Sequence, residues 1–154
     1  MDKLDRNILE KLQQQGRITN QELAESVGLS AAACLRRVQR LEDSGLIDRY
    51  VAILNARKLG LEMMVMAEVS LAQHSSTLLQ QFEEAAQVHP EILECHLMSG
   101  EADYLLKVLA RNTEDYERIY RSILTALPGV TRIRSSFAIR SIIQRTALPL
   151  PAGG

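Results

Sequence analysis

Three arginines fall within five positions of the segment GLSAAACLRRVQRLEDSG, which covers residues 28–45. Arg36, Arg37 and Arg40 carry guanidinium groups, which pair with phosphate oxygens and with the O6 and N7 acceptors of guanine. Alanine occupies positions 31–33 directly before them. A slim helix tip followed by a basic stretch suits a helix that enters the major groove of DNA.

A helical wheel separates these arginines from the apolar residues of the same segment. At about 100° per residue, with Ala31 set to 0°, the three arginines lie between roughly 140° and 240°. The apolar residues lie on the opposite arc, which we predict to pack inward: Cys34, Leu35, Val38 and Leu41. On this segment alone, a solvated face of an ordinary amphipathic helix explains the arginines equally well.

The residues before this segment predict the helix that would position it. An amphipathic helix over about 4–15 comes first. Thr19 then opens a short helix with Glu22 three residues later, which is the capping-box pattern, and Gly28 ends it. Ser30 is a suitable N-cap for the basic helix. Two short helices joined by a few residues predict a helix-turn-helix over about residues 18–37.

The apolar pattern of residues 46–54, LIDRYVAIL, predicts a short strand or hairpin after the basic helix. In a winged helix-turn-helix, Arg49 and Tyr50 would lie where the wing meets the DNA backbone or minor groove; a plain surface strand is the equal alternative. The predicted contacts with DNA are therefore Ser30, Ala31, Ala32, Arg36, Arg37, Arg40, Arg49 and Tyr50.

In the second half of the chain, the spacing of apolar residues changes from that of a helix to that of a strand. Residues 63–72 alternate between apolar and polar positions, as a half-buried strand does. Two helical stretches and three more strand-like stretches follow, the last over 130–143, in the order β-α-β-β-α-β of a ferredoxin-like domain. We predict an α+β protein with a DNA-binding domain over 1–60, a βαββαβ domain over 61–150, and a flexible tail over 151–154.

Composition and charge limit the partners. The net charge is −1, but residues 1–60 hold ten Lys/Arg against eight Asp/Glu, whereas residues 61–154 hold eight against eleven. The first half therefore carries a net positive charge, which favours contact with the phosphates of a nucleic acid. Cys34 and Cys95 form no metal-ligand or disulfide spacing. No nucleophile–base pattern, cofactor motif, signal peptide or membrane span is visible. We expect a cytoplasmic protein that is not an enzyme and needs no metal or cofactor.

Longer stretches resemble one family of regulators. The segment ITNQELAESVGLSAAACLRRVQRLEDSGLIDRYVAIL is similar to the DNA-binding domain of the Lrp/AsnC (leucine-responsive, or feast/famine) transcription factors, most specifically over CLRRVQRLEDSGLI. MSGEADYLLKV and SSFAIRSI resemble the effector-binding and oligomerisation domain of that family. The resemblance covers the chain from residue 1 to about residue 150.

The resemblance implies a DNA-binding transcriptional regulator with a winged helix-turn-helix and a βαββαβ domain. It implies a homodimer formed through the sheets, which assembles further to tetramers or octamers around which DNA wraps. It implies a small amino-acid effector bound near the oligomer interfaces, with leucine or methionine as the family's typical apolar choices. Such a protein is cytoplasmic and associated with a bacterial or archaeal nucleoid.

The resemblance also implies a place for the effector. The family's Gly-x-x-Asp loop, often followed by an aromatic residue, corresponds here to Gly100, Asp103 and Tyr104. Glycine lets backbone N–H groups approach a carboxylate, and aspartate pairs with an α-ammonium. Ser135 and Ser136 on the final strand are the other candidates. The motif GEAD taken alone reads as an ordinary hairpin turn, and Ala102 is smaller than the family leads one to expect.

Two alternatives remain at the level of sequence. The protein could be an architectural, global DNA-binding protein with no effector. It could also combine a protein-interaction module in the first half with an amino-acid-binding regulatory domain or small enzyme in the second. No catalytic pattern in the sequence supports the enzyme.

Overall fold

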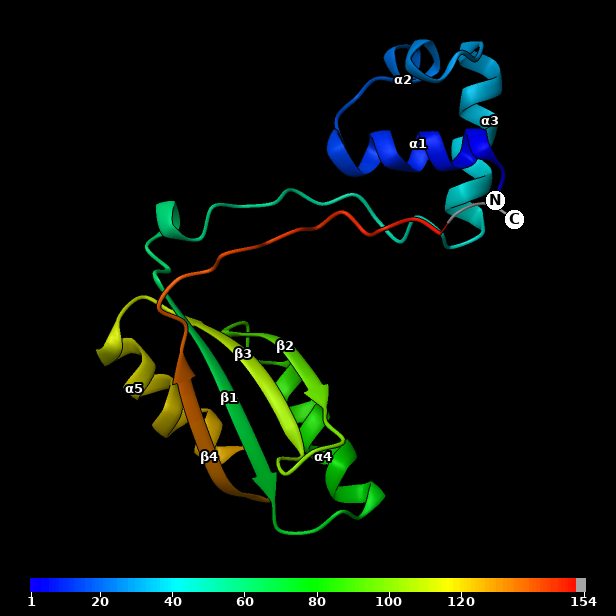
Figure 1. Ribbon diagram of the computed structural model, residues 1–154. Coiled ribbons are helices and arrows are strands. Elements are labelled where there is room, and N and C mark those ends of the chain that lie inside the picture. The colour runs from blue at the N-terminus through cyan, green and yellow to red at the C-terminus, as the bar shows by residue number, and fades with distance from the viewer. Residues whose placement is uncertain (152–154) are drawn as a thin grey trace. The chain divides into compact units, whose positions relative to one another are not determined.

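The computed structural model describes residues 1–151, which fall into two compact units (Figure 1). One unit comprises residues 1–53 together with the C-terminal segment from residue 142, and the other comprises residues 54–141. The second unit thus begins before the predicted bound of 61 and ends before the predicted bound of 150, and the residues from 142 on group with the N-terminal helices. Of the predicted flexible tail, only Pro151 lies among the described residues.

The first unit consists of three helices: α1 (Lys3–Gln14), α2 (Asn20–Val27) and α3 (Ala31–Asp43). The predicted caps are present. Thr19 and Glu22 form a capping box at α2, and the Ser30 side chain accepts a hydrogen bond from the N–H of Ala33 at α3. Gly28 ends α2 with a φ of 70°, a left-handed conformation that glycine adopts without steric cost. Seven buried side chains hold the helices together: Ile8, Leu9, Leu23, Ala24, Val27, Cys34 and Leu41.

The predicted strand or hairpin over 46–54 is not formed. Between the end of α3 and residue 62, all of which the structure describes, the chain is irregular except for the 3₁₀ turn Arg57–Leu59. Tyr50, Val51, Ile53 and Leu54 are exposed. Their apolar pattern is that of a strand, but within residues 1–151 no strand pairs with their backbone, and an isolated strand has no partner for its N–H and C=O groups.

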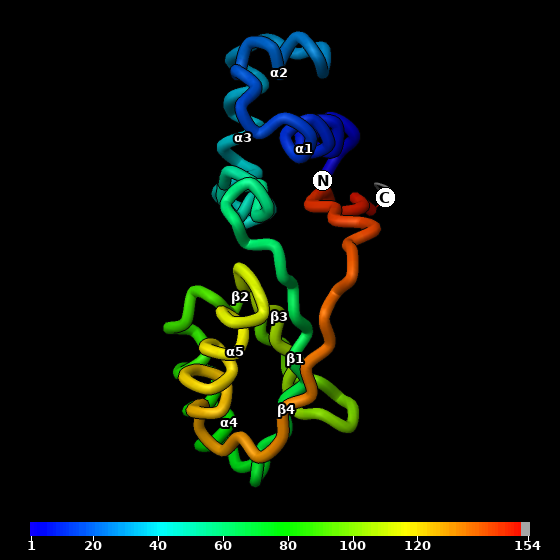
Figure 2. Tube along the Cα trace, turned by 90° about the vertical axis from the view of Figure 1, so that its left-hand side faces the viewer, coloured from blue at the N-terminus to red at the C-terminus, as the bar shows by residue number. Residues whose placement is uncertain are grey.

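The C-terminal segment returns to α1 (Figures 1 and 2). The side-chain amide of Gln13 donates to the carbonyl of Leu148 at 3.2 Å, and the N–H of Leu148 donates to Oε1 of Gln13 at 2.6 Å. Leu150 packs against the core of the three helices. These last residues thus complete the first unit, although they follow the second unit in sequence.

The second unit has the predicted βαββαβ order. Its elements are β1 (Met63–Leu71), α4 (Ser76–Gln87), β2 (Ile92–Leu97), β3 (Tyr104–Ala110), α5 (Thr113–Ser122), the 3₁₀ turn Leu124–Ala126 and β4 (Val130–Phe137). The sheet order is β2-β3-β1-β4 with antiparallel neighbours. The last strand is shorter than the predicted 130–143, because its pairing partner β1 begins at residue 63.

The helices α4 and α5 cover one face of this sheet (Figure 2). The predicted alternation of β1 is confirmed, since Val65, Ala67, Val69 and Leu71 are buried toward the helices. Within residues 1–151 no helix of this unit covers the other face. That open face carries partly exposed apolar side chains together with ion pairs such as Arg134–Glu68 and Lys107–Glu94.

Candidate nucleic-acid interface and ligand site

The buried side of α3 differs from the predicted one. Cys34 and Leu41 are buried as expected, but Leu35 is 46% exposed. The centre of the packed side therefore lies near 290° on the wheel, between Cys34 and Leu41, and Arg37 at roughly 240° is only about 50° from it. The arc opposite the packed side carries the exposed residues Ala32, Leu35, Arg36, Gln39 and Asp43.

Arg37 and Arg40 are held by two acids at the start of α1, its N-cap Asp2 and Asp5, rather than left free. Nη1 of Arg37 lies 2.6 Å from Oδ2 of Asp2 and 2.7 Å from Oδ1 of Asp5. Nη2 of Arg40 lies 2.8 Å from the same Asp5 oxygen and 2.9 Å from the other. The Asp5 side chain is 5% exposed, against 24% for Arg37 and 62% for Arg40.

The ionised state of Asp5 depends on this arrangement. Burial of its carboxyl raises the pKa, but hydrogen bonds from Arg37 and from the backbone N–H of Asp2 outweigh burial and hold the pKa below its ordinary value. Moving either arginine to a DNA phosphate would leave a buried carboxylate with fewer partners, which is unfavourable. The predicted DNA contacts Arg37 and Arg40 are therefore engaged within the chain, and Asp5 is the residue that the wheel of α3 alone did not reveal.

The other predicted contacts on α3 are accessible. Ser30, Ala31, Ala32 and Arg36 are exposed at the start of the helix. Within residues 1–151, Arg36 has no ion-pair or hydrogen-bond partner. Gln39 is likewise exposed and without such a partner in that range. It was not predicted from the sequence, although its position near 80° on the helical wheel places it on the exposed arc.

Arg49 and Tyr50 lie in the irregular segment after α3. Arg49 pairs with the neighbouring Asp48 at 3.3 Å, and both side chains are exposed. The Tyr50 hydroxyl donates to Oε1 of Glu42 at 3.0 Å, so this side chain turns back to α3. Burial and the nearby Glu42 carboxylate raise the pKa of Tyr50 to about 12. In this chain Tyr50 is thus an anchor of the segment to α3.

The predicted effector residue Asp103 lies in the loop between β2 and β3. Its Oδ2 accepts the N–H of Leu71 at 2.7 Å, and its Oδ1 lies 2.5 Å from Nε2 of His74. The hydrogen bond from Leu71 is the main reason that the pKa of Asp103 is held below its ordinary value, with His74 adding to it. Both oxygens are therefore engaged by the end of β1 and the residues after it, and His74 was not predicted from the sequence.

Gly100 lies in the same loop, but its backbone conformation does not require glycine. It is exposed, it does not have a positive φ, and open space surrounds the position of a Cβ. Its neighbour Glu101 pairs with Arg132 of β4 at 3.0 Å. The loop is thus pinned by Asp103 and Glu101, whereas Gly100 stays accessible to a ligand.

The remaining predicted effector residues point elsewhere. The buried Tyr104 stacks on Phe82, with ring centroids 4.4 Å apart, and its hydroxyl donates to Oε1 of Glu83 at 2.7 Å. The hydroxyl of Ser135 lies 2.6 Å from that of Tyr116 on the helix side of the sheet. Ser136 pairs with Met66 in register and so lies on the open face. A single chain therefore does not bring the five residues into one site.

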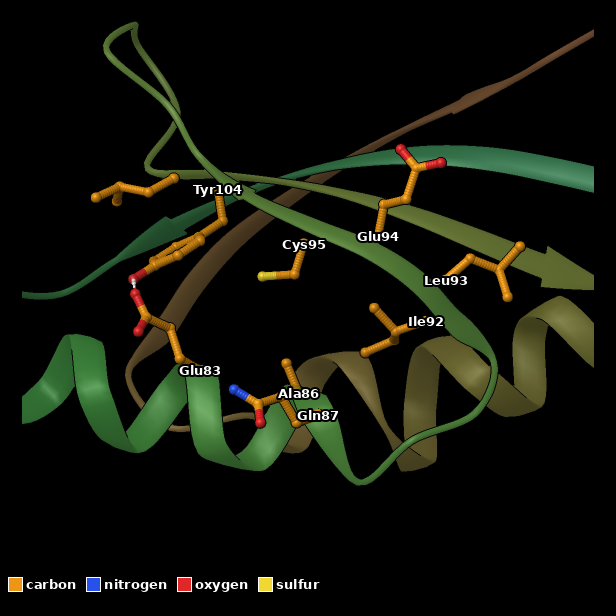
Figure 3. Close-up of a pocket in the computed structure, with 9 residues that line it drawn as sticks. Glu83, Ala86, Gln87, Ile92, Leu93, Glu94, Cys95 and Tyr104 are labelled. Atoms are coloured by element: carbon orange, nitrogen blue, oxygen red, sulfur yellow. Dashed lines mark hydrogen bonds between the residues drawn. The ribbon is translucent and has the colours of Figure 1, made fainter. Parts of the chain in front are cut away.

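A cavity of about 440 Å³ lies between α4 and the edge strand β2 (Figure 3). Glu83 and Gln87 line it from α4, and Leu93 and Cys95 line it from β2. Tyr104 also reaches it, with its hydroxyl on Glu83 as Figure 3 shows. Burial raises the pKa of the Cys95 thiol, with Glu83 adding to the effect, so the thiol stays protonated at neutral pH.

Among the residues that the structure describes, no three His, Cys, Asp or Glu side chains are grouped as a metal site would need. None of the helices in residues 1–151 is long and apolar enough to cross a membrane.

Comparison with known proteins places the chain. Residues 64–148 match the model of the Lrp/AsnC ligand binding domain, and residues 1–48 match that of a winged helix-turn-helix DNA-binding domain. The chain belongs to the Lrp/AsnC family. It is similar to the leucine-responsive regulatory proteins of Klebsiella pneumoniae and Escherichia coli strain K12, with 41% identity over 148 residues, covering 96% of this chain and 90% of each relative.

Solved structures of Lrp/AsnC regulators share the whole fold. A transcriptional regulator of Neisseria meningitidis, determined in complex with L-Met, has a TM-score of 0.92 at 35% identity and covers 97% of this chain and 96% of its own. An AsnC-family regulator of Agrobacterium tumefaciens has a TM-score of 0.92 at 36% identity, with 97% of each chain covered. The expected family and the expected α+β fold are thereby confirmed, and the protein is an Lrp-like transcriptional regulator with a DNA-binding and an amino-acid-binding domain.

Proposed function

We propose that this regulator binds operator DNA as a homo-oligomer through the exposed face of α3, and that a small amino acid changes this binding. The observation that carries the DNA contact is the start of α3, where Ser30, Ala31, Ala32 and Arg36 are exposed in a helix-turn-helix. Small side chains let the helix approach base pairs closely, and Arg36 supplies a free guanidinium. Arg49, exposed after α3, would add a contact with the DNA backbone.

We propose that two chains pair through the open face of the sheet. Met64, Met66, Leu105 and Leu109 are partly exposed there, and burying them against a second copy removes apolar surface from water. Such a dimer presents two copies of α3 to the two halves of a pseudo-palindromic operator. Further assembly of dimers, up to an octamer, is part of the proposal.

For the effector we propose an apolar amino acid such as methionine or leucine, bound at the loop of residues 98–103. The support is the match to the family's ligand-binding domain and the L-Met found in the Neisseria relative. Gly100 and Asp103 share this loop, so we propose them as its contacts. Tyr104, Ser135 and Ser136 would act through packing or through the oligomer interface.

We propose binding, not catalysis, as the activity, and the cytoplasm as its place, because the relatives are transcriptional regulators and operator DNA is found there. A second candidate is an effector-independent architectural DNA-binding protein. One observation favours it: both carboxylate oxygens of Asp103 already have a partner in the chain, so an effector ammonium would compete with His74 for Oδ1.

The decisive experiment combines ligand screening with DNA binding. Thermal unfolding of the full chain is measured with each of the twenty amino acids, because a ligand of the folded state raises the unfolding temperature. We expect methionine or leucine to raise it, and the same amino acid to change operator affinity in a mobility-shift titration. Specific DNA binding with no response to any amino acid would support the architectural alternative. No specific DNA binding at all would reject the proposed function.

A further inference from the structure

The exposed face of α3 offers a small and well-defined set of groups for reading bases. Ala32, Leu35, Arg36 and Gln39 are spaced by three, four and seven positions, so on a helix they form one contiguous patch. All four side chains are exposed. The patch lies opposite the buried Cys34 and Leu41, and therefore faces away from the helical core.

Only two side chains of this patch have hydrogen-bonding groups to offer. Within residues 1–151 neither Arg36 nor Gln39 has a side-chain partner, whereas Arg37 and Arg40 donate to Asp2 and Asp5 of α1. The pairing of Arg37 is the more complete, because its guanidinium is largely covered and touches both carboxylates. The intrachain pairs thus remove two of the three arginines from competition for bases.

The chemistry of the two free groups differs, and so do the bases they suit. A guanidinium pairs in two-point fashion with O6 and N7 of guanine, and a carboxamide pairs in two-point fashion with N6 and N7 of adenine. Leu35 is a bulky apolar side chain left exposed beside them, and apolar side chains recognise the C5-methyl group of thymine. Ala32 adds no bulk that would hold the helix away from the groove.

We propose that Arg36 reads a guanine, Gln39 reads an adenine and Leu35 contacts a thymine methyl group in each half of the operator. This inference rests on the proposed DNA-binding function and specifies its reading residues. Arg36 and Gln39 are three residues apart, which is about 4.5 Å along a helix axis. Base pairs of B-DNA are spaced about 3.4 Å apart. The guanine and adenine therefore lie within about two base pairs of each other.

The test starts with the unmodified protein. Full-length wild type is used to select binding sites from a random pool of duplex DNA, and affinities are then measured for the selected site and for each single-base change. We expect a half-site with a guanine and an adenine within two base pairs. Changing either base lowers wild-type affinity by about 5- to 150-fold, the range for a two-point base contact.

Variants then assign each position. Arg36→Ala loses the discrimination at the guanine and keeps it at the adenine, and Gln39→Ala does the reverse. For Leu35→Ala, replacing the contacted thymine by uracil, which lacks the methyl group, no longer lowers affinity, whereas in the wild type it does. Arg121→Ala and Gln80→Ala on the exposed helices of the second unit are matched controls that keep the wild-type motif.

The outcomes separate this inference from the function on which it rests. A wild-type motif that Arg36→Ala and Gln39→Ala recognise with unchanged discrimination would overturn the reading set and leave operator binding standing. The assignment of Arg36 and Gln39 would also be overturned if Arg37→Ala, with its fold intact by circular dichroism, lost the discrimination between bases instead. If wild type selects no motif, operator reading itself fails and this inference fails with it.

Discussion

The guanidinium of Arg37 on α3 lies 2.7 Å from the carboxylate of Asp5 on α1. This ion pair joins the first helix of the chain to the helix that we expect to enter the DNA groove. Because Arg40 donates to the same carboxylate, one buried Asp5 engages two of the three arginines that make α3 look basic. The pair sets the orientation of α3 and leaves Arg36 as the available guanidinium of its DNA-facing arc.

Replacing Asp5 by asparagine tests the strength of this link. Asp5→Asn keeps the shape of the side chain but removes the charge that accepts from Arg37 and Arg40. Hydrogen bonds to charged groups contribute about 1.5–3 kcal/mol each, so we expect a loss of about 2–3 kcal/mol in the free energy of unfolding of the first unit. Denaturant unfolding followed by helix circular dichroism measures it.

Asp43→Asn serves as the control, since Asp43 is exposed on α3, the helix whose arginines pair with Asp5. A surface substitution of this kind changes stability by about 0.5 kcal/mol or less. Equal unfolding midpoints for the two variants would show that the Asp5 carboxylate contributes no net stability.

Acid should destabilise the protein through its paired carboxylates. Asp115 accepts from Arg111 and Arg118, and these hydrogen bonds hold its pKa far below the ordinary 3.8. Asp5 is shifted in the same direction. A carboxylate with a lowered folded-state pKa stabilises above its unfolded value, so stability stays level from pH 7 to about 5 and falls below about pH 4.

The acid transition is measured as the urea midpoint at a series of pH values. Asp115→Asn should show a flatter dependence below pH 4 than wild type, because it lacks one of the groups that must be protonated in acid. An equally steep fall of the urea midpoint with pH in both proteins would show that Asp115 does not contribute to the loss of stability in acid.

His74 should compete with an effector for Asp103. His74→Ala removes the side chain that lies 2.5 Å from Oδ1 of Asp103. A contact of this exposed kind contributes about 0.2–1 kcal/mol, so we expect methionine or leucine to bind up to about five-fold more tightly in calorimetry. Asp103→Ala should abolish the binding while DNA affinity without effector remains.

His96→Ala is the matched control, because the His96 ring pairs with Glu94 at 3.1 Å on β2 and not with Asp103. We expect it to leave effector affinity unchanged. Tighter binding in both histidine variants would mean that the effect of His74 is not exerted through Asp103.

The C-terminal segment should stabilise the helices at the other end of the chain. Leu150 is partly buried against the first unit, so we expect Leu150→Ala to cost about 1–2 kcal/mol, less than the substitution of a fully buried leucine. Leu148→Ala is the control, because that side chain is 72% exposed and only its backbone bonds to Gln13. Thermal unfolding of both variants compares them, and an equal loss would contradict the packing role of Leu150.

The local signals of the sequence were sufficient for the helices of the first unit and for the order of elements in the second. Thr19, Glu22, Gly28 and Ser30 mark helix ends because a cap needs only a side chain and the next backbone N–H groups. Alternation in residues 63–71 identified β1 because a strand turns successive side chains to opposite faces. The order βαββαβ and the resemblance to one family followed from the same short-range patterns.

The sequence did not reveal the contacts between residues that lie far apart along the chain. The apolar residues 50–54 had the pattern of a strand, yet no strand in the described part of the chain pairs with them. Arg37 and Asp5 are 32 residues apart. Asp103 and Leu71 are separated by the same distance along the chain, and Gln13 and Leu148 by 135 residues. Composition and period indicated the helices and the four strands of the sheet, but also a strand over 46–54 that is not formed. Only tertiary packing decided which arginine is free and what engages Asp103, because ion pairs and buried hydrogen bonds depend on distance in space and not on spacing in sequence.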